Sequence, residues 1–158
     1  YHTEERMTRS EIPLELLMRE AGVEDLDGLD RVMLVISDNS ADRNKMAELV
    51  EKLSHDPQKY LLVAEDREAG VLCGSLLGVV FEDICDTCRP ILLVENVAVL
   101  PEYQGKGVGR KMFEEIEKWG KEQNCHYEIL VSGQNRTGAH EFYRRLGFHE
   151  EKGFKKYL

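Results

Sequence analysis

Patterns of apolar and polar positions divide the chain into helices and strands. Apolar residues recur at helical spacing in three segments, which predicts amphipathic helices over residues 24–37, 41–53 and 108–124. Runs rich in Val, Leu and Ile, bounded by turn residues, predict strands over residues 14–18, 60–64, 71–81, 91–100 and 127–131. A fourth helix is expected over 138–146, ending at Gly147, and residues 148–158 supply the last strand or strands.

The order of these elements predicts a mixed sheet. The strands over 60–64 and 71–81 are joined by a short turn and should form an antiparallel hairpin. A strand, a helix and a strand then follow over residues 91–131, and such a crossover unit is right-handed with parallel strands. The expected fold class is therefore α/β (mixed α+β), with a central sheet of six to seven strands and about four flanking helices.

Length, composition and charge narrow the class of protein. At 158 residues the chain fits one domain, which we assign to residues 13–158. Residues 1–12 are expected to form a flexible N-terminal segment, with Met7 as the candidate natural start after a tag or processed leader. No apolar run reaches the ~18 residues of a membrane span, and a formal charge of -9 opposes nucleic acid as the main partner. We expect a cytoplasmic protein that binds neither nucleic acid nor a membrane.

The cysteines do not predict a metal site. Cys73, Cys85, Cys88 and Cys125 occur in a chain that shows no secretory signal, for which reduced thiols are the default. Cys85 and Cys88 form a C-x2-C pair, but a structural zinc needs a second pair or a nearby Cys/His set at similar spacing. No metal is therefore expected.

The stretch over residues 94–112, VENVAVLPEYQGKGVGRKM, carries the strongest functional signal. An apolar strand leads through a turn opened by Pro101 into a helix, with three glycines spaced by two before and inside the helix start. Lys106, Arg110 and Lys111 crowd this start, where each extra cation costs roughly 0.3 to 1 kcal/mol. Free N–H groups, glycines and cations together form a site for phosphate or pyrophosphate.

Two common phosphate-binding patterns do not fit this turn. A Walker loop requires Gly-Lys followed by Ser or Thr, and a Rossmann fingerprint requires a third glycine where Arg110 stands. Gln104, Gly107 and Gly109 instead give Q-x-x-G-x-G at the end of a strand. In this motif, the chain resembles the GNAT N-acetyltransferase superfamily, whose pyrophosphate-binding motif is R/Q-x-x-G-x-G/A. Asn135 followed by AHEFYRRLGF is similar to a later motif of that family.

The resemblance covers roughly residues 15–158 and implies acetyl-CoA as cosubstrate, lying between two parallel strands that splay apart. It implies that the backbone of Val97, Ala98 and Val99 holds pantetheine and the thioester, with the Val99 amide as oxyanion donor. Asn135 is expected to cap the following helix, to reach pantetheine, or to do both. The resemblance assigns the pyrophosphate to the segment Gln104, Gly105, Lys106, Gly107, Val108, Gly109 and Arg110.

Two residues are candidates for proton transfer. Glu95 and Asn96 are polar neighbours in an apolar strand and should point to opposite faces. Burying a carboxylate without partners is costly, so Glu95 is either paired or placed for use. The resemblance makes it the general base for the amine, and the alternative is a structural hydrogen bond. Tyr143 matches the family tyrosine that protonates the departing thiolate, although an aromatic residue on a short helix is more often core.

These features predict an N-acetyltransferase that moves acetyl from acetyl-CoA to the primary amine of a small molecule, by direct attack on the thioester and without a metal. Glu82, Asp83 and Asp86 form an acidic loop that would attract a cationic amine, although such loops are usually only solvated. The alternatives are a protein or peptide N-acetyltransferase and a non-catalytic CoA-binding regulatory domain. The expected partners are the amine and, in a homodimer, a second copy of the chain.

Overall fold

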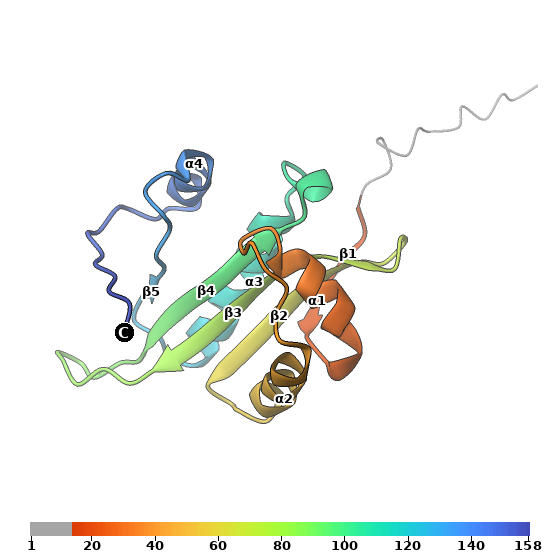
Figure 1. Ribbon diagram of the computed structural model, residues 1–158. Coiled ribbons are helices and arrows are strands. Elements are labelled where there is room, and N and C mark those ends of the chain that lie inside the picture. Colours follow the sequence, from red (N-terminus) through yellow and green to blue (C-terminus); the bar gives the residue numbers. More distant parts are fainter. Residues whose placement is uncertain (1–13) are drawn as a thin grey trace, which may run out of the picture.

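The computed structural model describes residues 14–158, so the expected flexible segment over 1–12 lies outside the described residues. One sheet with the order β1-β2-β3-β4-β5 forms its centre (Figure 1). The strands are β1 (Leu16–Glu20), β2 (Lys59–Asp66), β3 (Val71–Phe81), β4 (Ile91–Val99) and β5 (Glu128–Ile129). The helices are α1 (Leu26–Met33), α2 (Arg43–Ser54), α3 (Val108–Glu122) and α4 (Thr137–Arg145), with 3-10 turns at Val23–Asp25 and Pro101–Tyr103.

Strand pairing confirms the predicted hairpin and the parallel pair. β1, β2, β3 and β4 pair in sequence order and antiparallel, and β4 pairs with β5 in parallel. The prediction of six to seven strands is wrong for the described residues, which form a mixed sheet of five strands. Residues 148–158, expected to supply the last strand or strands, form none. After Phe148, the apolar side chains of this segment are exposed, with Phe154 91% exposed, so the segment has no apolar face to pack against the sheet.

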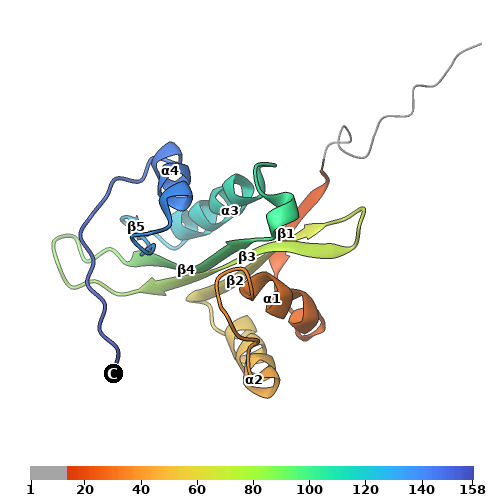
Figure 2. The ribbon, with the colours of Figure 1, turned by 45° about the horizontal axis from the view of Figure 1, so that its top comes forward.

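Helices cover both faces of the sheet. Figure 2 shows α1 and α2 on one face and α3 and α4 on the other. The central strands are therefore buried on both sides, and successive residues of β2 enter opposite clusters. Leu62 packs in the cluster under α3, whereas Val63 packs in the cluster under α1 and α2, and neither side chain is exposed.

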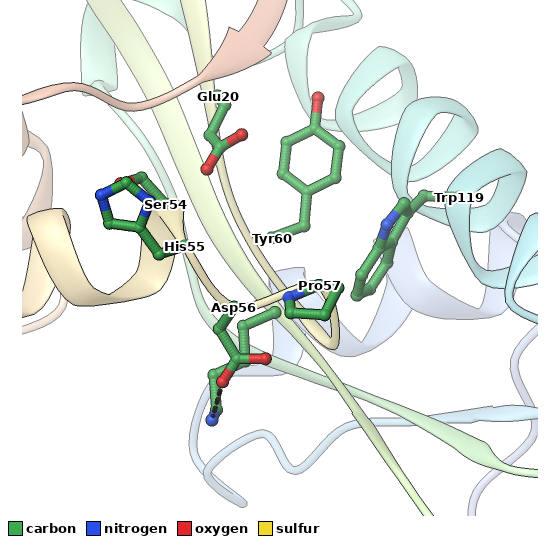
Figure 3. A pocket seen from close by; sticks show the side chains of 8 residues that line it. Glu20, Ser54, His55, Asp56, Pro57, Tyr60 and Trp119 are labelled. Atoms are coloured by element: carbon green, nitrogen blue, oxygen red, sulfur yellow. Dashed lines mark hydrogen bonds and ion pairs between the residues drawn. The ribbon is translucent and has the colours of Figure 1, made fainter.

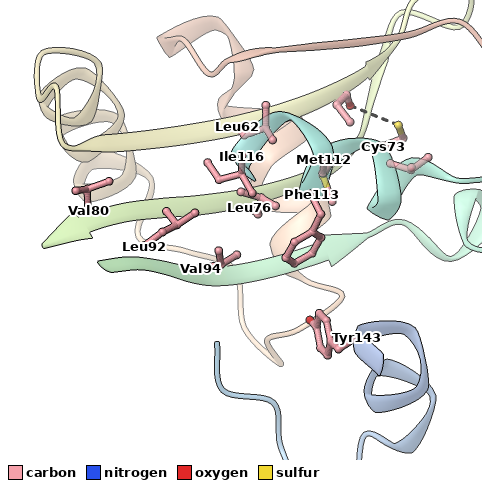
Figure 4. Packing of buried hydrophobic residues seen from close by; sticks show 12 residues of the cluster. Leu62, Cys73, Leu76, Val80, Leu92, Val94, Met112, Phe113, Ile116 and Tyr143 are labelled. Carbon is pink, nitrogen blue, oxygen red and sulfur yellow. Dashed lines mark hydrogen bonds between the residues drawn. The ribbon is translucent and has the colours of Figure 1, made fainter. Parts of the chain in front are cut away.

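Helix α3 lies close to β3 because two glycines leave room for it. The amphipathic helix predicted over 108–124 is confirmed in α3, where Met112 and Ile116 are fully buried (Figure 4). A Cβ atom on Gly78 would lie 2.5 Å from Cδ1 of Ile116, and one on Gly74 would lie 3.1 Å from Sδ of Met112. The small residues of β3 thus set the position of the helix that follows the glycine turn.

The cysteines lie in two different environments. Cys73 is buried, its thiol donates to the carbonyl of Ala64 at 3.4 Å, and burial raises its pKa to about 11. Cys85 and Cys88 are exposed on a turn closed by the Cys88 N–H and the Cys85 carbonyl at 3.0 Å. Among residues 14–158, no group of three or more His, Cys, Asp or Glu side chains could hold a metal ion. None of the described helices is long and apolar enough to cross a membrane.

A carboxyl group is enclosed where β5 meets α3. Oε2 of Glu128 is shut off from solvent and has no hydrogen-bond partner among the described residues. Burial, reinforced by the neighbouring carboxyl of Glu117, raises the pKa of Glu128 to about 8, while Lys121 acts in the opposite direction. Glu128 is therefore protonated near neutral pH, when the enclosed group carries no charge.

We expect the stability of the fold to decrease as pH rises from about 4.5 to about 8, the ordinary and the raised pKa of Glu128. Across this window the unfolded chain releases the Glu128 proton while the folded chain retains it, so the stabilisation present below the lower pKa is lost. Glu128→Gln removes this titration, so the variant should melt higher than the wild type above pH 8. Thermal unfolding followed by circular dichroism checks this result.

The matched control for this measurement is Glu122→Gln, because Glu122 is exposed on α3. Its melting temperatures should follow those of the wild type at every pH. If the melting temperatures of the wild type and Glu128→Gln changed with pH in the same way, Glu128 would not hold a proton in the folded state.

Candidate active site

Strands β4 and β5 part soon after they meet. Their pairing is limited to Leu92 with Glu128 and Leu93 with Ile129. β4 remains paired with β3 as far as Val99, opposite Gly74, so its backbone is engaged on that side only. Over the second half of β4, the edge facing the segment after β5 is therefore open within the described chain. Such an edge offers N–H and C=O groups to an extended ligand.

The end of this open edge can be assigned atom by atom. The N–H of Leu100 donates to the carbonyl of Cys73 at 2.8 Å, toward β3. Because successive N–H groups of a strand point to opposite edges, the N–H of Val99 points to the open edge. The carbonyl of Val99 accepts a hydrogen bond of 3.1 Å from Nε2 of Gln104. The Gln104 side chain thus ties the glycine turn to the end of β4 and leaves the Val99 N–H available.

A bulge in the middle of β4 places two polar side chains in solvent. Leu77 is opposite Glu95 and Ser75 is opposite Ala98, so two residues of β4 oppose one of β3. Asn96, inside the bulge, has a φ of 54°. Glu95 and Asn96 are both exposed, so the expectation that Glu95 is a carboxylate buried in an apolar strand is wrong. The bulge interrupts the alternation on which that expectation rested.

The glycine turn and the start of α3 form an open, cationic surface. Gly107 is the N-cap of α3 with a φ of 83°, and Gly105 has a φ of 76°, both in the left-handed region that favours glycine. A Cβ atom on either glycine would meet nothing within 4 Å. No side chain caps the helix, and its first turn holds no acidic residue. The exposed side chains of Lys106 and Arg110 border the free N–H groups, as an anion site requires.

Gly109, the third glycine of the turn, is required by packing between helices and not by its backbone conformation. A Cβ atom on Gly109 would lie 2.8 Å from Cζ of Phe142, on α4. Gly109 therefore permits the contact between α3 and α4. Val108, beside it, is buried in the core with 1% exposure. Within the segment 104–110, residues 104–107 and Arg110 are therefore exposed, whereas Val108 packs in the core and Gly109 against α4.

Tyr143 belongs to an aromatic cluster between α3 and α4. Its ring centroid lies 5.9 Å from that of Phe113, which Figure 4 shows beside it, and 5.9 Å from that of Phe148. The residue is 9% exposed, and its hydroxyl makes no hydrogen bond with residues 14–158. Burial raises the pKa of Tyr143, while the nearby charge of Arg136 acts in the opposite direction. The phenol therefore retains its proton at neutral pH, as a proton donor requires.

Asn135 lies in the turn before α4 but does not cap the helix. The N-cap is Arg136, and no side chain makes the capping hydrogen bond. The capping role considered for Asn135 is therefore wrong. Its side chain is exposed, and the contact with pantetheine stays a prediction.

Ser132 is a candidate site residue that sequence reasoning did not identify. It follows β5, in the segment that diverges from β4, and its Oγ is shut off from solvent without a hydrogen-bond partner among the described residues. A buried hydroxyl without a partner costs about 1 to 3 kcal/mol. No signal in the sequence marks this residue, because a serine in a polar loop is ordinary.

Hydrogen bonds restrain part of the acidic loop before β4 and of the connection from α1 to α2. In the loop between β3 and β4, the Asp83 carboxylate accepts from the N–H of Cys85 at 3.1 Å and stabilises the turn. In the connection from α1 to α2, Asp30 accepts from the N–H of Ala41 at 2.9 Å. Glu82 and Asp86 are exposed, so the acidic character of the loop is preserved at its surface.

Comparison with known proteins agrees with this geometry. A family model described as the acetyltransferase (GNAT) family matches residues 23–148. The aminoglycoside N(6')-acetyltransferase type 1 of Acinetobacter genomosp. 13 is 28% identical over 72 residues, which are 44% of this chain and 49% of that protein. The chain thus spans less than half the length of such curated relatives.

Solved structures resemble the chain over nearly its whole length. Glucosamine-6-phosphate N-acetyltransferase from Arabidopsis thaliana superposes with a TM-score of 0.81, at 18% identity, covering 91% of this chain and 99% of that one. The aminoglycoside N-acetyltransferase AAC(6')-Iy in complex with CoA gives a TM-score of 0.78 at 17% identity, covering 93% and 96%. At this identity the likeness concerns the fold, and the family model covers most of the chain. The chain belongs to the acetyltransferase (GNAT) family.

Proposed function

We propose that the protein transfers the acetyl group of acetyl-CoA to the primary amine of a small molecule. The observation that carries this proposal is the open edge of β4, which is followed, after the turn over residues 100–107, by an uncapped, cationic helix start. An extended thioester arm and a pyrophosphate are the two parts of acetyl-CoA that these neighbouring features suit. The complex of a structural neighbour with CoA supports the same cosubstrate.

The chain fits acetyl-CoA at three places. The N–H groups at the start of α3, with Lys106 and Arg110, suit the pyrophosphate, and the space before Gly107 is open for it. The open edge at Val97, Ala98 and Val99 suits the amide groups of pantetheine. The Val99 N–H, which points to that edge, suits the thioester oxygen as negative charge develops on it.

Proton transfer completes the proposed reaction. The neutral amine attacks the thioester carbon, the C–N bond forms, the C–S bond breaks, and CoA leaves as thiolate. Glu95, exposed at the bulge, would accept the proton that the amine loses, directly or through water. Tyr143 would donate a proton to the thiolate, and burial favours its protonated form before the reaction.

A small, cationic acceptor is favoured over a peptide. The curated relative from Acinetobacter genomosp. 13 is named as an aminoglycoside acetyltransferase, which acts on a small polyamine. The exposed Glu82 and Asp86 of the loop before β4 would attract such a cation. Homodimer formation stays a prediction.

Replacing Arg110 should separate binding from stability. We expect Arg110→Gln to weaken CoA binding about ten-fold or more, because a charged hydrogen bond contributes roughly 1.5 to 3 kcal/mol. The free protein should become slightly more stable, since a cation is unfavourable at a helix start. Calorimetric titration with CoA and thermal unfolding without it measure the two effects. Lys118→Gln, exposed toward the other end of α3, is the control. Equal effects of both substitutions on CoA affinity would refute a local site.

Replacing Ser132 should likewise have opposite effects on the free and bound protein. Ser132→Ala removes a buried hydroxyl that has no partner within the described chain, so the free protein should be at least as stable as the wild type. If this hydroxyl bonds pantetheine, CoA affinity should fall about three- to ten-fold. Unchanged CoA affinity would exclude Ser132 from the site.

Acetyl transfer itself is tested by thiol release from acetyl-CoA with aminoglycosides, polyamines and peptides. We expect Glu95→Gln to lower kcat/KM about 100-fold or more. The loss should shrink at high pH, where the amine is already neutral. Tyr143→Phe should lower kcat with little change in stability, because the hydroxyl makes no hydrogen bond with residues 14–158.

Glu102→Gln and Tyr127→Phe alter exposed residues of the same types and serve as matched controls. Release with peptides alone would favour a peptide acetyltransferase. CoA binding without release from any amine would favour a non-catalytic domain and overturn the proposal.

A further inference from the structure

A pocket of about 590 Å³ lies away from the open edge of β4 (Figure 3). Its wall includes Glu20 at the end of β1, Tyr60 near the start of β2 and Trp119 in the last turns of α3. Trp119 is eleven residues after Val108, so about 16 Å of helix separates the pocket from the helix start. The pocket is therefore distinct from the proposed acetyl-CoA site.

The pocket exists because β1 is shorter than β2. The last residue of β1, Glu20, pairs with Leu62, and the N–H of Ala21 reaches the carbonyl of Leu61 at 2.9 Å. Lys59 and Tyr60 lie beyond this point, where β1 no longer covers the outer edge of β2. Side chains of β2 and α3 consequently border an open space.

Two aromatic rings form one wall of the pocket. The ring centroids of Tyr60 and Trp119 are 5.7 Å apart, and the ring planes are almost perpendicular, at 86°. Gly78 of β3 leaves room for the indole, because a Cβ atom there would lie 3.2 Å from its Cζ3. The rings are thus held by packing, and both project into the same space in Figure 3. The face of an aromatic ring is negative and attracts cations.

The charge left uncompensated in the pocket is negative. Lys59 is bound by Asp56 at 2.6 Å, and His55 contacts Glu51 at 3.0 Å. The carboxylate of Glu20 has no hydrogen bond or ion pair with any of residues 14–158, and in Figure 3 it lies on the same side of the pocket as the Tyr60 hydroxyl. A pocket with its lysine neutralised and a carboxylate unpaired disfavours an anion.

A second carboxylate strengthens this negative character. Burial raises the pKa of Tyr60 to about 12, and the carboxylates of Glu115 and Glu20 add to the effect. Both carboxylates therefore lie close enough to the phenol to act on a charge beside it. The same two carboxylates would stabilise a positively charged group at this position.

We propose that this pocket binds a small organic cation, whose ammonium group lies against Tyr60 and Trp119 with Glu20 as its counter-ion. The combination of aromatic faces and a carboxylate is the general means by which proteins recognise ammonium groups. The proposal does not depend on acetyl transfer.

Choline is the probe that tests this proposal, and 3,3-dimethylbutan-1-ol is its uncharged isostere. Trp119 is the single tryptophan of the chain, so intrinsic tryptophan fluorescence reports on this pocket directly. Choline should change the fluorescence saturably, and the alcohol should not. Equal responses to both compounds, or no saturable response to choline, would overturn the proposal.

Substitutions in the pocket test whether choline binds there. Glu20→Gln should weaken choline binding about two- to five-fold, as expected for an exposed ion pair, and Tyr60→Leu about three- to thirty-fold through loss of the cation–π contact. Tyr60→Phe keeps the ring and should retain binding, which separates loss of the contact from misfolding. Glu68→Gln, in the turn beyond the other end of β2, is the matched control. If Glu68→Gln weakened binding as much as Glu20→Gln, or if Tyr60→Leu had no effect, the proposed site would be wrong.

Discussion

The separation of β4 from β5 is the constraint on which the candidate site depends. Only Leu92 and Leu93 of β4 are paired with β5, and the strand is then held by β3 alone. Ordinarily an open backbone edge in the middle of a sheet would be unfavourable, because its polar groups lack partners. Here the open edge leads directly into the glycine turn, so the same stretch of backbone that lacks a strand partner ends at a helix that lacks a cap. A ligand with an amide-containing arm and a phosphate would satisfy both.

The glycine turn needs glycine for two different reasons, backbone conformation and close packing, which the sequence alone does not distinguish. Gly105 and Gly107 adopt positive φ and face open space, whereas Gly109 is small because Phe142 of α4 packs against it. The same α4 carries Tyr143, which packs on Phe113 of α3. Ligand-facing backbone and the proposed proton donor are therefore positioned through one helix–helix contact, and a change in that contact would move both.

The sequence was sufficient where periodicity decides the structure. The β2–β3 hairpin and the buried stripe of α3 are local patterns, and both are present. It failed where context decides: the bulge at Asn96 exposes Glu95, and the charged segment 149–158 finds no strand partner.

Features built from distant parts of the chain were also invisible to the sequence. The enclosed hydroxyl of Ser132 depends on packing around the divergent strand, and the pocket of Tyr60 and Trp119 joins residues almost sixty positions apart. No local pattern marks either, since each residue is ordinary in its own segment.

Helix α3 connects the two proposed ligand sites, and its peptide dipoles make them electrically complementary. The start of the helix carries partial positive charge, where Arg110 adds to it, and its last turns carry partial negative charge near Trp119. One helix thus favours an anion at one end and a cation at the other. Because Val108 and Trp119 are about 16 Å apart along the helix and the screening length is about 8 Å at physiological salt, direct attraction between the two ligands would be weak. Any influence of one ligand on the other would have to pass through the packing of α3 against β3.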